Sequence, residues 1–190
     1  MEYTVYQGTE QNVTIPSTLK NNNHRYEVTS IAASAFKNNK SIRTVTIGKN
    51  ITKIGKSAFY GCTSLKTVNG ATNVKTIGDK AFYKCKSLNT MAMKTKLTSI
   101  GKYAFYKCTS LKKITIPSRV SKIGTRAFYG CTKLKSITIK TTKLTSSRIG
   151  SSAFKNTYKK ATVKVPSQKV TSYKKLLKNK GLSSQAKVKK

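Results

Sequence analysis

The stretch that decides the fold is LTSIGKYAFYKCTSLKKITIPSR, residues 97–119, because most of the chain repeats it. An alanine precedes every phenylalanine of the series Phe36, Phe59, Phe82, Phe105, Phe128 and Phe154. The first four steps of this series are 23 residues long and the last is 26. Isoleucines five residues earlier keep the same register, as do the cysteines at 62, 85, 108 and 131. A fixed period near 23 predicts a solenoid of stacked repeats.

The segment LKKITI, residues 111–116, has the two-residue period of a strand. We expect Leu111, Ile114 and Ile116 to point inward, with Lys113 and Thr115 outward. The same frame predicts the inward sets Ile42/Val45/Ile47, Leu65/Val68, Leu88/Met91/Met93 and Leu134/Ile137/Ile139. Stacked in parallel, these strands are expected to form one continuous sheet.

The segment KYAFYKC, residues 102–108, fits a short helical turn that buries Ala104, Phe105 and Cys108. The glycine that follows most of the isoleucines suits a tight turn or a close backbone approach. These patterns predict a right-handed leucine-rich-repeat solenoid of the α/β type. It would contain about six repeats of 23 residues, mostly short parallel strands plus short helical turns.

Three regions are predicted. Residues 1–30 form an N-terminal partial repeat or cap, and residues 31–166 form six leucine-rich repeats. The sixth repeat is degenerate, because Thr157 occupies the cysteine column and Lys160 the leucine column. Residues 167–190 form a cap helix and a basic tail.

The cap helix is predicted over residues 171–180, where Tyr173, Leu176 and Leu177 share one helical face. An open solenoid end supplies a partner for that face, which favours a cap over a membrane-surface helix. Candidate N-caps are Ser167, Thr171 and Ser172, and Gly181 is placed to end the helix. Residues 183–190 are expected to be a frayed strand or a disordered tail.

The pattern I-G-x-x-A-F-x-x-C-x-x-L-x-x-I-x-I-P-x-x-V resembles the BspA-like leucine-rich repeats of bacterial surface proteins, over about residues 28–166. The resemblance implies a non-enzymatic module at the cell surface or secreted. It also implies adhesion, since members of the family contact host matrix proteins or other cells. Many members have no known ligand, so the resemblance specifies the fold more closely than the partner.

Charge is the second strong feature of the sequence, with 39 Lys and Arg against 4 Asp and Glu. Three of the acids lie in residues 1–27 beside two bases, so residues 28–190 hold 37 bases and one acid. So few carboxylates and the single histidine, His24, leave little material for carboxylate catalysis or metal ligation. We therefore expect no catalytic residue, metal or cofactor, although a pocket converging on His24 and Glu27 would reopen an enzyme.

The N-terminal residues lack the basic and apolar regions of a signal peptide, and no apolar run of 18 residues occurs. A surface or secreted location therefore rests on the resemblance and not on a targeting signal in this segment.

The four cysteines occupy one inward column, one per repeat. Buried cysteine packs as a small apolar residue, so we favour free thiols over disulfides, and both over metal binding. Replacement by alanine or serine is then expected to be tolerated at a modest cost in stability.

A second aromatic column follows the phenylalanines. We predict a ligand-binding strip from Tyr60, Tyr83, Tyr106 and Tyr129, with Lys84 and Lys107 beside two of them. The alternative, which we favour, is that stacked tyrosines simply cover the convex side, since isolated exposed aromatics are ordinary.

A surface of one charge repels itself, which indicates a use for the lysines or neutralisation by another part of a larger protein. We expect a monomeric adhesion module that binds host or wall polyanions or matrix proteins. The alternative is a structural spacer or wall-anchoring repeat. Nucleic acid is expected to bind only non-specifically, because arginine is scarce and no recognition motif is present.

Overall fold

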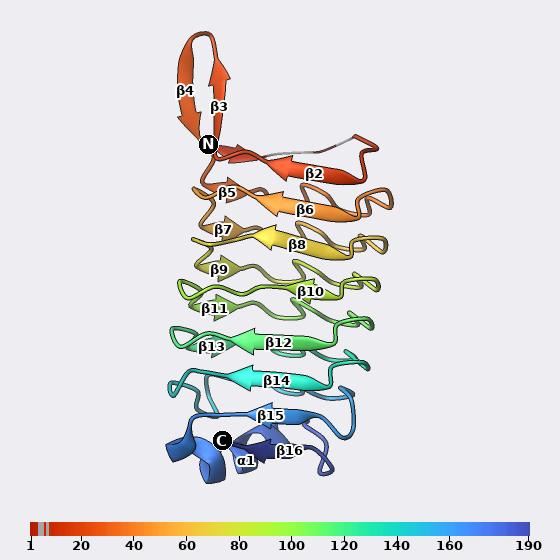
Figure 1. The fold of residues 1–190 in the computed structure, drawn as a ribbon, viewed down its shortest axis with the longest axis vertical. Helices are drawn as coiled ribbons and strands as arrows, with labels where there is room; N and C mark the ends of the chain where they lie inside the picture. Colours follow the sequence, from red (N-terminus) through yellow and green to blue (C-terminus); the bar gives the residue numbers. More distant parts are fainter. Residues whose placement is uncertain (4–5, 7) are drawn as a thin grey trace.

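The computed structural model describes residues 1–3, 6 and 8–190. These residues form an elongated stack of coils, and the chain advances from one coil to the next along the long axis (Figure 1). The leucine-rich-repeat solenoid expected from the sequence is thus confirmed.

Each regular coil contributes one strand to a front row and one to a second row behind it (Figure 1). The front row comprises β2 (Asn12–Ile15), β6 (Thr44–Ile47), β8 (Thr67–Gly70), β10 (Thr90–Met91), β12 (Lys113–Ile116), β14 (Ser136–Ile139), β15 (Thr162–Lys164) and β16 (Lys187–Lys189). The second row comprises β1 (Glu2–Tyr3), β5 (Ser30–Ile31), β7 (Lys53–Ile54), β9 (Thr76–Ile77), β11 (Ser99–Ile100) and β13 (Lys122–Ile123). Strands within a row pair in parallel, with residues of the same column opposite each other.

The single continuous sheet expected from the sequence is wrong in two respects. The front row is two four-stranded sheets, β10-β8-β6-β2 and β12-β14-β15-β16, and the second row is a separate six-stranded sheet. The break in the front row follows β10, which has only two residues and ends before Ala92. Alanine has a low preference for strands, whereas threonine or asparagine holds this position in most other coils.

The segments expected to be short helical turns are not helical. In residues 103–107, the N–H groups of Tyr103, Phe105 and Lys107 donate to carbonyls of the next coil at 2.7–2.8 Å. A helix would use these groups internally. Every second N–H group thus points to the next coil. This arrangement includes left-handed backbone at two positions per coil, here Tyr103 (φ 56°) and Lys107 (φ 53°). In the part of the chain that the structure describes, the helices are η1 (Ser167–Lys169) and α1 (Val170–Asn179).

The glycine that follows β7, β9, β11 and β13 allows a close backbone approach, as expected. A Cβ placed on Gly78 would lie 2.8 Å from the backbone carbon of Gly55 in the preceding coil. That neighbour is backbone and cannot rotate away, so the coils could not stack at this spacing with a side chain here.

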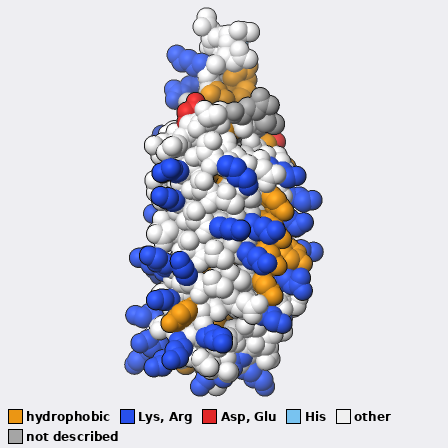
Figure 2. All heavy atoms as spheres, turned by 90° about the vertical axis from the view of Figure 1, so that its right-hand side faces the viewer, with side chains coloured by type: hydrophobic (Ala, Val, Ile, Leu, Met, Phe, Trp, Pro, Cys, Tyr) orange, Lys and Arg blue, Asp and Glu red, His pale blue; other side chains and the backbone are white. Residues whose placement is uncertain are grey.

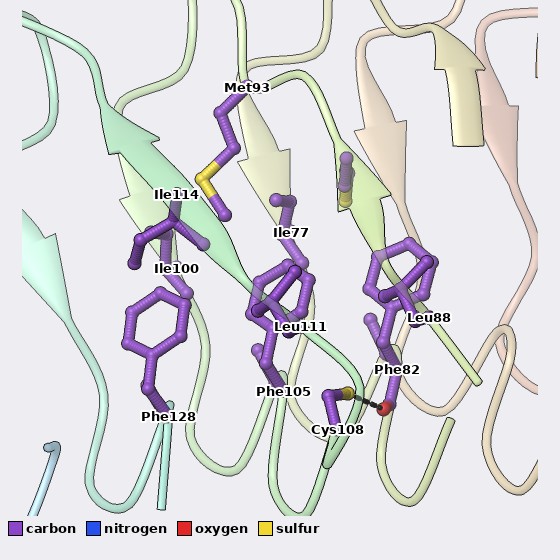
Figure 3. Packing of buried hydrophobic residues seen from close by; sticks show 14 of the residues in the cluster. Ile77, Phe82, Leu88, Met93, Ile100, Phe105, Cys108, Leu111, Ile114 and Phe128 are labelled. Carbon is purple, nitrogen blue, oxygen red and sulfur yellow. Dashed lines mark hydrogen bonds between the residues drawn. The ribbon is translucent and has the colours of Figure 1, made fainter. Parts of the chain in front are cut away.

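The core is a column of phenylalanines that runs the length of the repeats, which we call the phenylalanine ladder: Phe36, Phe59, Phe82, Phe105, Phe128 and Phe154. All six are buried, neighbouring ring centroids lie 4.8–5.5 Å apart, and their planes agree within 12°. Figure 3 shows Phe82, Phe105 and Phe128 of this ladder. The predicted inward strand residues, from Ile42 to Ile139, are also buried.

The four cysteines are free and buried, as predicted. Each thiol donates to a phenylalanine carbonyl of the preceding coil, and Cys108 reaches the Phe82 oxygen at 3.1 Å (Figure 3). Burial raises the pKa of Cys62 and of Cys131 from 9.0 to about 12. The cysteine column therefore links neighbouring coils as well as filling space.

The N-terminal segment adds a partial coil and a hairpin. Strand β2 pairs with β6, so that Val13 lies opposite Val45. The hairpin consists of β3 (Thr18–Asn21) and β4 (His24–Glu27), and it projects from the end of the stack (Figure 1). Left-handed Asn22 (φ 45°) and Asn23 (φ 61°) make the tight turn between its strands.

The predicted cap helix is confirmed as α1, which buries Tyr173 and Leu177 against the last coils. The Tyr173 hydroxyl donates to the Thr141 carbonyl and accepts the Leu144 N–H, both at 3.1 Å. The predicted side-chain N-cap is wrong, because α1 follows directly from η1 and its N-cap is Lys169 without a side-chain bond. Gly181 (φ 93°) ends the helix region as expected. The tail forms strand β16, which pairs with β15.

Candidate interaction surface

The tyrosines predicted as a ligand-binding strip form a second stacked column, which we call the tyrosine ladder: Tyr60, Tyr83, Tyr106 and Tyr129. Their ring centroids lie 4.7, 4.8 and 5.1 Å apart, and their planes agree within 11°. All four side chains are half-buried. The parallel register of the coils produces this ladder, since each tyrosine directly follows a member of the phenylalanine ladder.

Cations accompany every ring of the tyrosine ladder. Lys84 Nζ lies 5.5 Å from the Tyr83 centroid, and Lys107 Nζ lies 5.6 Å from that of Tyr106. Both distances are within the range of cation–π attraction. The structure thus places both predicted lysines beside the tyrosines that were predicted with them.

Two further cations at the ladder were not singled out from the sequence. Lys37 Nζ lies 5.8 Å from the Tyr60 centroid, and the Arg126 guanidinium carbon lies 5.7 Å from that of Tyr129. Column alignment would have found Lys37, because it follows Phe36 as the tyrosines follow their phenylalanines. Arg126 reaches the ladder from a left-handed turn position (φ 52°), which the expectation of a helical turn misplaced.

Stacking decides which parts of these rings a ligand can reach. Interior rings have both faces covered by neighbouring rings near 5 Å, so a sugar cannot lie flat on them. The ring edges and hydroxyl groups remain for contact. The ladder therefore offers a row of phenol groups flanked by ammonium groups, which suits hydrogen bonding to an anionic chain.

The pKa of Tyr83 is raised from its usual value of 10.0, mainly because partial burial disfavours the phenolate. The neighbouring tyrosines add repulsion to its charged form. The hydroxyl of Tyr83 is therefore a protonated donor at neutral pH.

Charge is distributed over the whole length of the solenoid. Figure 2 shows lysine and arginine side chains from one end of the visible face to the other, whereas the acidic side chains gather near the N-terminal end. The one acid beyond residue 27, Asp79, accepts the Lys102 backbone N–H at 2.7 Å. This carboxylate oxygen therefore already has a hydrogen-bond partner in the next coil.

From the sequence, an enzymatic function would be considered again only if His24 and Glu27 shared a pocket. These residues lie at opposite ends of β4 in the projecting hairpin, and both are exposed. Among the described residues, no three His, Cys, Asp or Glu side chains gather in a way that could hold a metal ion. No helix in residues 1–3, 6 and 8–190 has the length and apolar character to cross a membrane.

Comparison with known families identifies the repeats. A family model of the BspA type leucine rich repeat region matches with six copies, over residues 6–135 and 56–183. The chain belongs to this family. No match was found among curated proteins.

Solved structures of bacterial leucine-rich repeat proteins support the fold. The leucine rich repeat protein of Treponema pallidum superposes with a TM-score of 0.71 and 25% identity, covering 98% of this chain and 91% of that one. A leucine-rich repeat protein from Bacteroides ovatus superposes with a TM-score of 0.62 and 27% identity, covering 82% of this chain and 51% of that one. The pneumococcal vaccine antigen PcpA gives 0.60 and 18%, covering 100% of this chain and 44% of that one, and shows the fold alone.

Proposed function

We propose that this BspA-type solenoid is a non-enzymatic interaction module of the cell surface that binds anionic polymers through its basic outward columns. The observation that carries the proposal is the tyrosine ladder, in which four half-buried phenols each have a cation within 6 Å. Sulfated or sialylated glycans, wall polymers with phosphate groups and acidic patches of matrix proteins share the chemistry that this surface would recognise.

A surface location is supported by the family and by a structural relative. A Faecalibacterium prausnitzii protein described as a leucine rich cell surface protein matches with 22% identity and a TM-score of 0.50. Adhesion follows as a proposal from the same family, because a stacked repeat surface presents one binding pattern many times over.

Retention on heparin at 150 mM salt tests the polyanion part of the proposal. We expect the chain to elute at a higher salt concentration than a folded basic protein of matched net charge. The variant K84Q/K107Q should elute earlier than K66Q/K112Q, which loses the same charge from exposed positions directly before β8 and β12. Equal shifts would remove the ladder from the proposal, and no retention above the matched protein would overturn polyanion binding itself.

A second candidate is a spacer or wall-anchoring repeat. It is favoured by the share of two relatives that the chain spans, 51% and 44%, because such coils also occur within longer proteins. Here the lysines would bind the anionic wall of the producing cell. Sedimentation with purified cell wall, with and without teichoic acid, separates this role from host binding.

A further inference from the structure

A hollow of about 880 Å³ lies near the C-terminal end, between the last coil and the segment that follows α1. Three lysines line it, Lys155, Lys159 and Lys160, together with Tyr158. Ser183 and Gln185 line it from the segment after the helix. We call this hollow the lysine pocket. Its volume falls within the range of small-molecule sites in proteins.

The lysine pocket lies where the sixth repeat departs from the pattern, since Thr157 and Lys160 both line it. In four earlier coils the cysteine thiol reaches the carbonyl of the preceding coil. Thr157 stands in that column here, and its hydroxyl instead donates to Phe154 of its own coil at 3.0 Å. Lys160 replaces a buried leucine and is exposed. The sixth coil therefore lacks the thiol bond to the preceding coil and the buried leucine that the earlier coils have.

Backbone contacts hold both walls of the pocket in place. The Phe154 N–H donates to the Lys180 carbonyl at 3.0 Å, which ties the last coil to the end of the helix region. The Gly130 N–H donates to the Lys155 carbonyl at 3.0 Å, which ties the wall to the coil before it. The pocket is thus built from anchored segments and not from a free loop.

The chemistry of the lining selects an anion. No aspartate or glutamate lines the pocket, and the last acid in the chain is Asp79. Three lysines that line one hollow without an acidic side chain give it a positive potential, and a bound anion lowers the repulsion among them. Ammonium groups act as compact charges with three donors each, so they can bind sulfate, phosphate or carboxylate from several directions.

The remaining lining favours a sugar as the carrier of that charge. Tyr158 is half-buried, and Lys135 Nζ lies 5.3 Å from its ring centroid. The interior rings of the tyrosine ladder are covered on both faces by their neighbours, whereas Tyr158 borders the open hollow. The hydroxyl and amide groups of Ser183 and Gln185 are suited to sugar hydroxyls.

We propose that the lysine pocket binds a single anionic sugar residue, with its acidic group among Lys155, Lys159 and Lys160 and its ring against Tyr158. The lysine pocket is a discrete site, distinct from the extended basic surface of the proposed function. It rests on that proposed function only for the chemical class of the ligand, an anionic sugar. Asn156, which also lines the pocket, donates to the Tyr129 hydroxyl at 3.1 Å. A longer anionic chain can therefore continue from the pocket onto the tyrosine ladder.

Titration of the full chain with monosaccharides at 150 mM salt tests the pocket, followed by NMR shifts of its amides. Glucuronic acid and glucose 6-phosphate are the probes, because they separate carboxylate sources such as host glycans from phosphate sources such as wall polymers. We expect saturable binding at one site for at least one of them and none for glucose. Inorganic phosphate binding as tightly as glucose 6-phosphate, or no shifts with either acidic sugar, would overturn the proposal.

Charge-matched variants locate the binding. K159Q/K160Q should weaken it by roughly tenfold, since two charge-assisted bonds are lost, whereas K66Q/K112Q should leave it within about twofold. All four lysines are exposed, so both variants are expected to fold, which circular dichroism checks. Equal weakening in both variants would overturn a discrete pocket. Heparin retention of the same proteins reports on the proposed function separately, so the two can fail independently.

Discussion

The phenylalanine ladder and the tyrosine ladder run side by side through the solenoid, one residue apart in the second to fifth coils. Both stack near 5 Å with nearly parallel rings. The phenylalanines are fully buried, while the tyrosines are half-buried and carry cations. One repeat period thus produces both a buried ladder and a partly exposed one. Which side of the backbone a column faces decides whether its rings are buried in the core or remain partly exposed at the surface.

The largest test of this difference is to remove one ring from each ladder. Phe105→Ala should lower the free energy of unfolding by about 3–5 kcal/mol, because a large buried ring leaves a cavity. Tyr106→Ala should cost only about 1 kcal/mol, the scale of lost aromatic stacking at a half-buried site. Urea unfolding followed by circular dichroism measures both. Similar losses at the two positions would contradict the distinction.

A second test uses the cysteine thiols, which donate to phenylalanine carbonyls of the preceding coil. The folded state keeps Cys62 and Cys131 protonated up to a pKa of about 12, whereas unfolded thiols ionise near 9.0. The stability that they contribute is therefore complete below pH 9 and lost as the pH rises from 9 towards 12. We expect no thiol to react with a disulfide reagent at pH 8 until the chain is unfolded.

The matched variant for this test is C62A/C131A. It should lose about 1–3 kcal/mol per site at pH 7, since a carbonyl partner and some volume are removed. Its further loss between pH 9 and 11 should then be smaller than that of the unmodified chain. An identical alkaline loss in the two proteins would show that these thiols do not control it.

The smallest expected effect is that of a single hydroxyl on the tyrosine ladder. Tyr83→Phe keeps the stacked ring, so the free energy of unfolding at pH 7 should change by less than about 0.5 kcal/mol. The raised pKa of Tyr83 means that its neutral form favours the folded state, a contribution present below pH 10 and lost above it. The variant should therefore lose less stability than the unmodified chain between pH 10 and 11. A large loss at pH 7 would assign the hydroxyl a structural role.

Most of the fold was predictable because its determinants repeat. Each inward column appears at least four times, so the noise of a single position averages out and the solenoid and its core follow. The cap helix occurs once and was predictable from its own apolar face. The turns at residues 103–107 were not predictable in the same way. Their spacing fits a helix, but their N–H groups are shared with the next coil. A local pattern carries no information about bonds to a segment 23 residues away.

The candidate site divides along the same line. The sequence alone determined the column of Tyr60, Tyr83, Tyr106 and Tyr129 and the lysines beside it, because parallel stacking converts sequence period into spatial neighbours. The three-dimensional packing was needed to see that the ring faces cover one another, that Arg126 joins the ladder, and that residues of the sixth coil line the lysine pocket. Whether a ring face is covered and whether a pocket forms depend on how closely neighbouring coils pack. The sequence does not state those packing distances.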